Sequence, residues 1–122
     1  MSLSVVVLEK NPKVAQSLVG GLRTHFRSVH LACSREELRD RVSSNLPEVV
    51  VFDIESSRLT DVASLHQDFP ALPIVCTHRI PDEEMWMAAL EAGASDVCAS
   101  DDVDSVLSSV LRSVARTNAV AA

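Results

Sequence analysis

Aromatic residues and glycine are scarce in this chain. Its 122 residues include no tyrosine, one tryptophan, three phenylalanines and three glycines, although 47% of the residues are hydrophobic. A core with so little aromatic area has to be built from valine, leucine and alanine, which suits a parallel sheet covered by helices. The chain also lacks internal repeats, linkers and low-complexity tracts. These features predict one domain, residues 1–122, with a single core.

Cysteines are few and poorly spaced for a covalent or metal framework. Cys33, Cys76 and Cys98 are odd in number and form no C-x-x-C pair, which argues against a disulfide framework and a zinc site. We expect them to be small core residues of a protein in a reducing compartment, the cytoplasm. Three histidines likewise have no spacing that would join them in a metal site: His25, His30 and His66.

Long apolar runs and clusters of basic residues are absent as well. No run approaches the roughly 18 apolar residues of a membrane span, and the first residues lack the layout of a signal peptide. The 11 lysines and arginines are scattered, and 17 acidic residues give a net charge of −6. Binding to nucleic-acid phosphates requires clustered cations, so we expect neither a membrane segment nor a nucleic-acid surface.

Residues 47–61 contain the clearest strand signal. Val49, Val50, Val51 and Phe52 form an apolar run that is too short for a buried helix and β-branched enough for a strand buried on both faces. Asp53 ends the run, and open α/β sheets bind ligands at the carboxyl ends of such strands. An aspartate there can also be only a turn residue or a helix cap. Further strands are predicted at residues 4–8, 28–32, 73–77 and 97–99.

The segments between the strands carry helix signals. Asn11 is predicted to cap a first helix, which ends near residues 25–27. Ser34 and Glu37 are predicted to form a capping box at the start of a second helix. A third helix has to end before Pro70, a fourth spans residues 81–92 with Gly93 at a left-handed cap, and a fifth spans 101–116. The apolar residues that these helices are expected to bury are Val14, Leu18, Leu22, Phe26, Leu38, Val42, Leu46, Val62, Leu65, Phe69, Val103, Val106, Leu107, Val110, Leu111 and Val114.

Strands and helices thus alternate along the chain, five of each. Such alternation predicts an α/β fold with a parallel sheet, right-handed crossovers and helices on both faces. Residues 3–116 form the predicted core of the domain. Residues 117–122 are interpreted as a frayed tail, where a longer chain was cut.

Four segments in order, at matching spacing, resemble the receiver domains of bacterial two-component response regulators. They are VVVLEKNP at the first strand, PEVVVFDIES at the central strand, LPIVCTH at the fourth strand and EAGASDV after the fourth helix. The resemblance covers residues 3–116. It implies a doubly wound, flavodoxin-like sheet of order 2-1-3-4-5. It also implies a signalling module rather than an enzyme, in which an aspartate accepts a phosphoryl group beside Mg²⁺.

The resemblance assigns expected roles to residues at the strand ends. Asp53 matches the phosphoacceptor, and Glu9 matches the first of two acids that hold Mg²⁺ with it. Lys10 stands where the second acid belongs, and Ser100 stands where the family has a lysine that pairs with the phosphoryl group. Phosphoryl transfer depends on positioning and on neutralising charge, so both replacements remove working parts. We therefore expect weak Mg²⁺ binding, which is typical of a divergent or pseudo-receiver.

The remaining motif positions are altered too. The threonine or serine that follows the phosphoryl oxygen matches His78 without a gap and Thr77 with a shift of one residue. Val97 takes the place of an aromatic switch residue, and Asp101 takes the place of a proline. The segment after Asp53 lacks the Met-Pro and Asp-Gly signature and is about one helical turn short.

Two directions are open for the side chain of Lys10. Pointing into the crevice, its ammonium would repel Mg²⁺ and pair with Glu9 or Asp53, and a pair at about 4 Å is worth ~4 kcal/mol before desolvation. Pointing outward, it would leave the crevice unaffected.

Two functions follow from these features. The first is a signalling module that acts by binding proteins, with phosphorylation at Asp53 weak or lost. The second is a receiver that accepts a phosphoryl group on Asp53 with Mg²⁺. Flavin binding on the same topology is a weaker third, because no Ser/Thr/Gly-rich phosphate loop follows the first strand.

Met85, Trp86 and Met87 suggest a partner surface. Three successive bulky residues point around more than half of a helix, so they cannot all face the sheet. The family's usual dimer or output surface lies at this helix and the following strand, near Val97. We expect a histidine kinase, another signalling protein, an attached output domain or a second copy of the chain to bind there, although a Trp86 packed over Ala88 and Ala89 is the alternative.

Overall fold

The computed structural model describes residues 3–121, with side chains described through residue 117. Five parallel strands form one sheet in the order β2-β1-β3-β4-β5, which confirms the predicted topology. The strands are β1 (Ser4–Leu8), β2 (Ser28–Ala32), β3 (Val49–Asp53), β4 (Ile74–His78) and β5 (Asp96–Ala99). The helices between and after them are α1 (Pro12–Leu22), α2 (Arg35–Asn45), α3 (Leu59–Asp68), α4 (Glu83–Glu91) and α5 (Val103–Ala121).

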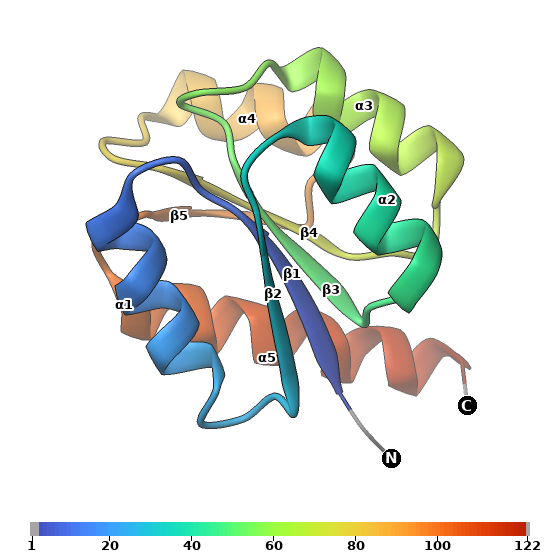
Figure 1. Cartoon of the computed structure of the whole chain (residues 1–122). Coiled ribbons are helices and arrows are strands. Elements are labelled where there is room, and N and C mark those ends of the chain that lie inside the picture. Colours follow the sequence, from blue (N-terminus) through green and yellow to red (C-terminus); the bar gives the residue numbers. More distant parts are fainter. Residues whose placement is uncertain (1–2, 122) are drawn as a thin grey trace.

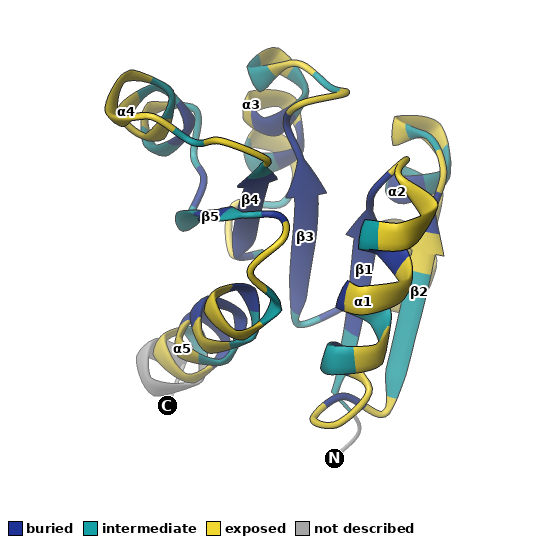
Figure 2. Ribbon diagram, turned by 90° about the vertical axis from the view of Figure 1, so that its left-hand side faces the viewer, coloured by how far each residue is buried: buried dark blue, intermediate teal, exposed yellow. Residues whose placement is uncertain are grey.

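Helices cover both faces of the sheet (Figure 1). Helices α1 and α5 lie on one face, and α2, α3 and α4 lie on the other. Because side chains alternate along a strand, each central strand contributes to two cores, one on each face of the sheet, rather than to the single core predicted. Val5 and Val7 of β1 join the α1–α5 core, whereas Val6 and Leu8 join the other. Burial is complete along β3, while the edge strand β2 is only partly covered (Figure 2).

Local side-chain chemistry fixes where the helices begin. The Asn11 side chain accepts hydrogen bonds from two N–H groups of the first turn of α1, as predicted. Ser34 Oγ accepts from the Glu37 N–H at 3.1 Å, but the Glu37 carboxylate accepts from the Cys33 N–H rather than from Ser34. Only half of the predicted capping box is therefore formed, because Glu37 bonds the residue before Ser34 instead of Ser34 itself. Helix α4 begins after Asp82, whose side chain caps it.

Two predictions about burial are wrong. Leu46 was expected in the core, but α2 ends at Asn45 and Leu46 adopts a left-handed backbone with φ of 47°, which leaves it 73% exposed. Cys33 was expected in the core, but it lies in the loop between β2 and the cap of α2 and is exposed. Cys76 and Cys98 are buried, as predicted. Gly93 has a positive φ of 112°, as its predicted role requires.

Helix α5 runs further than its apolar pattern predicted. It continues through Ala121 rather than ending near Arg116, because neither glycine nor proline follows that residue. Thr117 is part of the helix, and its hydroxyl donates to the Ser113 carbonyl at 3.0 Å. Residue 122, the last of the predicted tail, and residues 1–2 lie outside the described part of the chain. No helix within residues 3–121 has the length and apolar character needed to cross a membrane.

Candidate phosphoacceptor site

Four of the predicted site residues lie at the carboxyl edge of the sheet. Asp53 and Thr77 are direct partners in the β3–β4 register, and Glu9 follows Leu8, the β1 partner of Phe52. Ser100 follows β5, and its N–H donates to the His78 carbonyl at 3.0 Å. The side chains of Glu9, Asp53, Thr77 and Ser100 are all buried. The structure therefore gathers residues from four strand ends into one small, largely enclosed region.

The Asp53 carboxylate is bonded by its own loop. Oδ1 accepts from the Glu55 N–H at 2.9 Å, and Oδ2 accepts from the Ser56 hydroxyl at 2.5 Å. Among the described residues, no lysine, arginine or histidine forms an ion pair with Asp53. Both oxygens are thus partly satisfied without a cation.

Glu9 adds a second carboxylate close to Asp53. Its Oε2 accepts from the Asn11 N–H at 3.1 Å. Burial raises the pKa of Glu9, and the charges of Asp53 and Glu55 raise it further, although the Asn11 N–H acts in the opposite direction. Like charges therefore gather here without a neutralising side chain, which is the electrostatic setting that suits a cation.

Lys10 does not supply that neutralising charge. Its side chain is exposed and forms no ion pair with any residue of the described part of the chain. The prediction that Lys10 pairs with Glu9 or Asp53 inside the crevice is wrong, and the outward alternative is correct. An exposed ammonium keeps its hydration and avoids the desolvation that entry into a buried crevice would cost. Lys10 instead lines a hollow on the outer side of Asp53.

Because Ser100 stands where the receiver pattern has a lysine, no amine reaches the crevice from this position. The lysines of this sequence are Lys10, in the loop after β1, and Lys13, on α1, and both are exposed. A lysine side chain from the β5 end is therefore excluded by the sequence itself. Ser100 is buried at that position and is too short to replace an ammonium.

The structure separates the two candidates for the switch position. Thr77 is fully buried in register with Asp53, and its Oγ1 has no hydrogen-bond partner among the described residues. His78 is half-buried, and its Nδ1 accepts from the Ile80 N–H at 3.0 Å and lies 3.7 Å from Glu55 Oε1. Because successive side chains of a strand point to opposite faces, only Thr77 projects to the same face of the sheet as Asp53.

Sequence reasoning missed Glu55, Ser56 and Arg79. Ser56 donates to Asp53, and the Glu55 carboxylate accepts from the Arg79 N–H at 2.8 Å, which ties the β3–α3 loop to the β4–α4 loop. All three lie within three residues of the end of a strand, β3 or β4. Even with Glu55, no group of three potential metal-ligating side chains is found within the described residues.

The predicted surface on α4 is partly exposed. Trp86 is 43% exposed and Met87 is 52% exposed, whereas Met85 and Val97 are partly buried against the α2–α4 core. The prediction that at least one of the three bulky residues is exposed is confirmed. Ile80, in the loop before α4, is also largely exposed and was not predicted.

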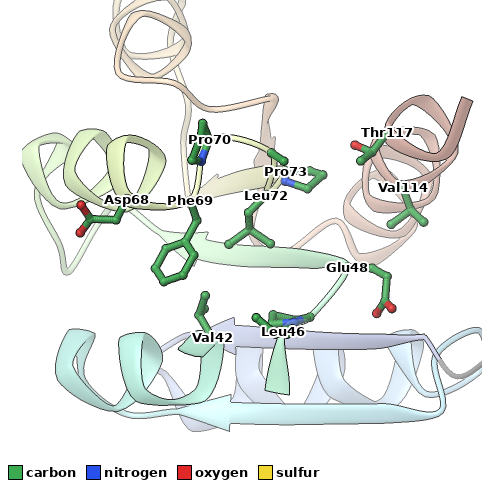
Figure 3. A pocket seen from close by; sticks show the side chains of 12 residues that line it. Val42, Leu46, Glu48, Asp68, Phe69, Pro70, Leu72, Pro73, Val114 and Thr117 are labelled. Carbon is green, nitrogen blue, oxygen red and sulfur yellow. The ribbon is translucent and has the colours of Figure 1, made fainter. Parts of the chain in front are cut away.

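A separate apolar hollow of about 410 Å³ lies at the opposite edge of the sheet. Side chains from the end of α2, the α3–β4 connection and α5 face it, and those of Leu46, Phe69, Leu72 and Val114 are prominent (Figure 3). Glu48 on its rim is bonded to Ser4, and Asp68 is paired with Arg39. The hollow therefore offers mainly apolar area, with the Glu48 carboxylate on its rim hydrogen-bonded but in no ion pair of the described residues.

Comparison with solved structures reveals the same architecture in signalling proteins. The N-terminal signal receiver domain of a two-component response regulator from Bacteroides fragilis superposes with a TM-score of 0.84 at 21% identity, covering 93% of this chain and 98% of that one. A CheY-like response regulator receiver domain protein from Methanospirillum hungatei JF-1 gives 0.85 at 13% identity, covering 97% and 98%. This chain has the fold of a response regulator receiver domain.

A third similar structure is a receiver domain in its BeF3-activated form. The BeF3-activated DrrB receiver domain matches with a TM-score of 0.81 at 17% identity, covering 93% of this chain and 98% of that one. Identities of this size establish the receiver fold alone. No family model matches the sequence, and no curated protein sequence matches it.

Proposed function

We propose that this domain is a cytoplasmic signalling module that acts by binding proteins, with phosphorylation at Asp53 weak or lost. The observation that carries the proposal is that no amine lies beside Asp53: Ser100 is buried at the β5 end, and the exposed Lys10 forms no ion pair within the described residues. A receiver that accepts a phosphoryl group needs an ammonium and a metal to neutralise the equatorial oxygens. Here Ser100 stands in place of the ammonium and an outward Lys10 in place of one acid.

The partners we propose are a histidine kinase, another signalling protein, an attached output domain or a second copy of the chain. Trp86 and Met87 support this part of the proposal, since large exposed apolar side chains are enriched at protein interfaces. The scattered cations and net charge of −6 do not favour nucleic acid. A domain of this kind works as a binding module rather than as an enzyme.

One observation favours the alternative of a phosphotransfer-competent receiver. The buried Thr77 hydroxyl lacks a partner among the described residues and lies in register with Asp53. A phosphoryl oxygen on Asp53 would supply an acceptor for it. Glu9 and Asp53 would then be the two carboxylates that hold Mg²⁺, whose remaining ligands are usually water and phosphate oxygens.

Titration with Mg²⁺ and beryllofluoride distinguishes the two functions. We expect weak Mg²⁺ binding and no stable beryllofluoride complex, measured from backbone amide shifts of residues 53–56, 77–79 and 99–101. Replacing Lys10→Asp together with Ser100→Lys restores an acid and an ammonium, and we expect it to raise Mg²⁺ affinity about tenfold or more, or ~1.4 kcal/mol.

A matched control separates the effect of where the new carboxylate lies from the effect of the change in net charge. Lys13→Asp with Ser100→Lys makes the same change in charge, but Lys13 is exposed on α1 and does not follow Glu9 directly. We expect this variant to gain less Mg²⁺ affinity than the restored one. Tight Mg²⁺-dependent beryllofluoride binding by the natural sequence, abolished by Asp53→Asn, would instead establish the alternative function.

A further inference from the structure

A hollow of about 420 Å³ lies on the outer side of the β3–α3 loop, next to Asp53 but separate from the buried carboxylates. The residue after Glu9, the start of α2 and the start of α3 form its walls. Ser56 connects the two regions, since it lines the hollow and donates to Asp53. A volume of this size is in the range that accommodates small-molecule ligands.

The hollow has an excess of positive charge. Lys10, Arg35 and Arg58 line it. The Arg35 guanidinium is used locally, 2.7 Å from Asp61 and 3.3 Å from Glu36, the two acids of the lining. Lys10 and Arg58 form no ion pair within the described part of the chain. Two uncommitted cations thus face one cavity of a protein whose net charge is −6.

Neutral donors accompany these cations. Four hydroxyl groups line the same hollow: Ser34, Ser56, Ser57 and Thr60. Arg58 is the N-cap of α3, and its guanidinium has no acceptor atom to cap the helix. The Asp61 carboxylate accepts from the Arg58 N–H at 3.3 Å, and the Asp61 N–H donates to the Arg58 carbonyl. Cationic side chains together with hydroxyl groups are a combination that binds oxyanions in proteins.

We propose that this hollow binds a small oxyanion of the phosphate-monoester class, held by Lys10 and Arg58. Binding there requires neither Mg²⁺ nor a phosphoryl group on Asp53, so it is independent of the proposed function. The ligand would compete with Asp53 for the Ser56 hydroxyl and thereby change the conformation of the β3–α3 loop. The same chemistry is offered by inorganic phosphate and by a phosphate ester on an organic group, and the cavity volume favours the ester.

The test is a titration of the protein with inorganic phosphate and, separately, with phenyl phosphate, both in EDTA. We expect saturable binding, tighter for the ester, with amide shifts at residues 10, 34–36 and 56–61. Lys10→Ala and Arg58→Ala should each weaken binding about tenfold or more, as expected for the loss of a charge-assisted hydrogen bond. Lys13→Ala and Arg41→Ala remove exposed cations outside the hollow and should leave affinity unchanged.

Asp53→Asn separates this site from the phosphoacceptor site. It removes a negative charge beside the hollow, so oxyanion binding should be unchanged or tighter, whereas binding through Asp53 and Mg²⁺ would be lost. Melting curves of all variants establish that each is folded. The proposal is overturned if neither probe saturates at ~10 mM, where RT ln Kd is only about −3 kcal/mol. Equal binding by the two alanine variants and their controls would overturn it as well.

Discussion

Thr77 is the buried polar residue whose hydrogen bonding is least satisfied within the described part of the sheet. Its side chain is fully buried between β3 and β5, and its hydroxyl has no partner there. An unsatisfied buried hydroxyl costs about 1–3 kcal/mol relative to one that is hydrogen-bonded. The residue is therefore a stability cost at the place where a phosphoryl acceptor would offset it.

Replacing Thr77→Val should stabilise the fold. Valine keeps the shape and the β-branch but removes the unpaired hydroxyl, so we expect the free energy of unfolding in urea to rise by about 1–2 kcal/mol. Thr117→Val is the control, because that hydroxyl donates to the Ser113 carbonyl and should give no gain when removed. A loss of stability in Thr77→Val would show that the Thr77 hydroxyl is satisfied in solution.

At the scale of the element, α2 ends in an unfavourable backbone conformation. Leu46 lies in the left-handed region, with φ of 47°, and its N–H donates to the Val42 carbonyl at 3.0 Å. A side chain with a Cβ pays roughly 1–2 kcal/mol for that conformation, which glycine avoids. Burial of the Leu46 side chain offsets little of this cost, because the residue is 73% exposed.

Leu46→Gly should consequently stabilise α2. We expect the melting temperature to rise by roughly 3–5 °C, equivalent to about 1 kcal/mol. Asn45→Gly, one residue earlier and inside the helix, should have the opposite effect, a loss of about 0.5 kcal/mol. If Leu46→Gly is instead destabilised, the contacts of Leu46 at the apolar hollow outweigh the backbone strain.

The strands and helices also show which features the sequence could predict and which it could not. The central strand and the start of α1 depend on local signals, the β-branched run at 49–52 and the side chain of Asn11, and these predictions are confirmed. Helices α4 and α5 begin at Glu83 and Val103, two residues later than predicted. The exposure of Leu46 and Cys33 depends on where α2 stops and how the chain leaves it, which the apolar spacing does not encode. The outward direction of Lys10 depends on which neighbour is buried, and position alone left both directions open.

The end of α5 and the roles of the loop residues were missed for a different reason. Nothing after Arg116 stops a helix, so an end there had no chemical basis. Glu55 and Ser56 follow Asp53 directly, but their bonds depend on the fold of the β3–α3 loop, which periodicity does not describe.

At the scale of the molecule, α4 exposes two large apolar residues, Trp86 and Met87, whereas Leu31, Leu46 and Ile80 are exposed outside α4. If α4 is a binding surface, Trp86→Ala should weaken self-association by about 2 kcal/mol, or roughly thirtyfold, because interface energy concentrates in aromatic anchors. Sedimentation at several concentrations measures the dissociation constant. Because Trp86 is 43% exposed, the melting temperature should fall by less than it would for a fully buried tryptophan.

Met85→Ala provides the contrast. Met85 is partly buried against the core, so its truncation should lower the melting temperature more than that of Trp86 and affect association less. If Trp86→Ala instead lowers the melting temperature strongly and leaves self-association unchanged, Trp86 is a core residue and not a binding anchor. A natural sequence that stays monomeric throughout would exclude a second copy as the partner at α4.

Trp86 also determines what an optical experiment on this protein can detect. The chain has one tryptophan and no tyrosine, so its ultraviolet emission comes from a single indole on α4. That indole already contacts water in the folded state, and unfolding should therefore shift its emission only slightly. A protein that covers α4 would remove the water and shift the emission to shorter wavelength. Intrinsic fluorescence should thus report docking at α4 more faithfully than unfolding, which is better followed by far-ultraviolet circular dichroism.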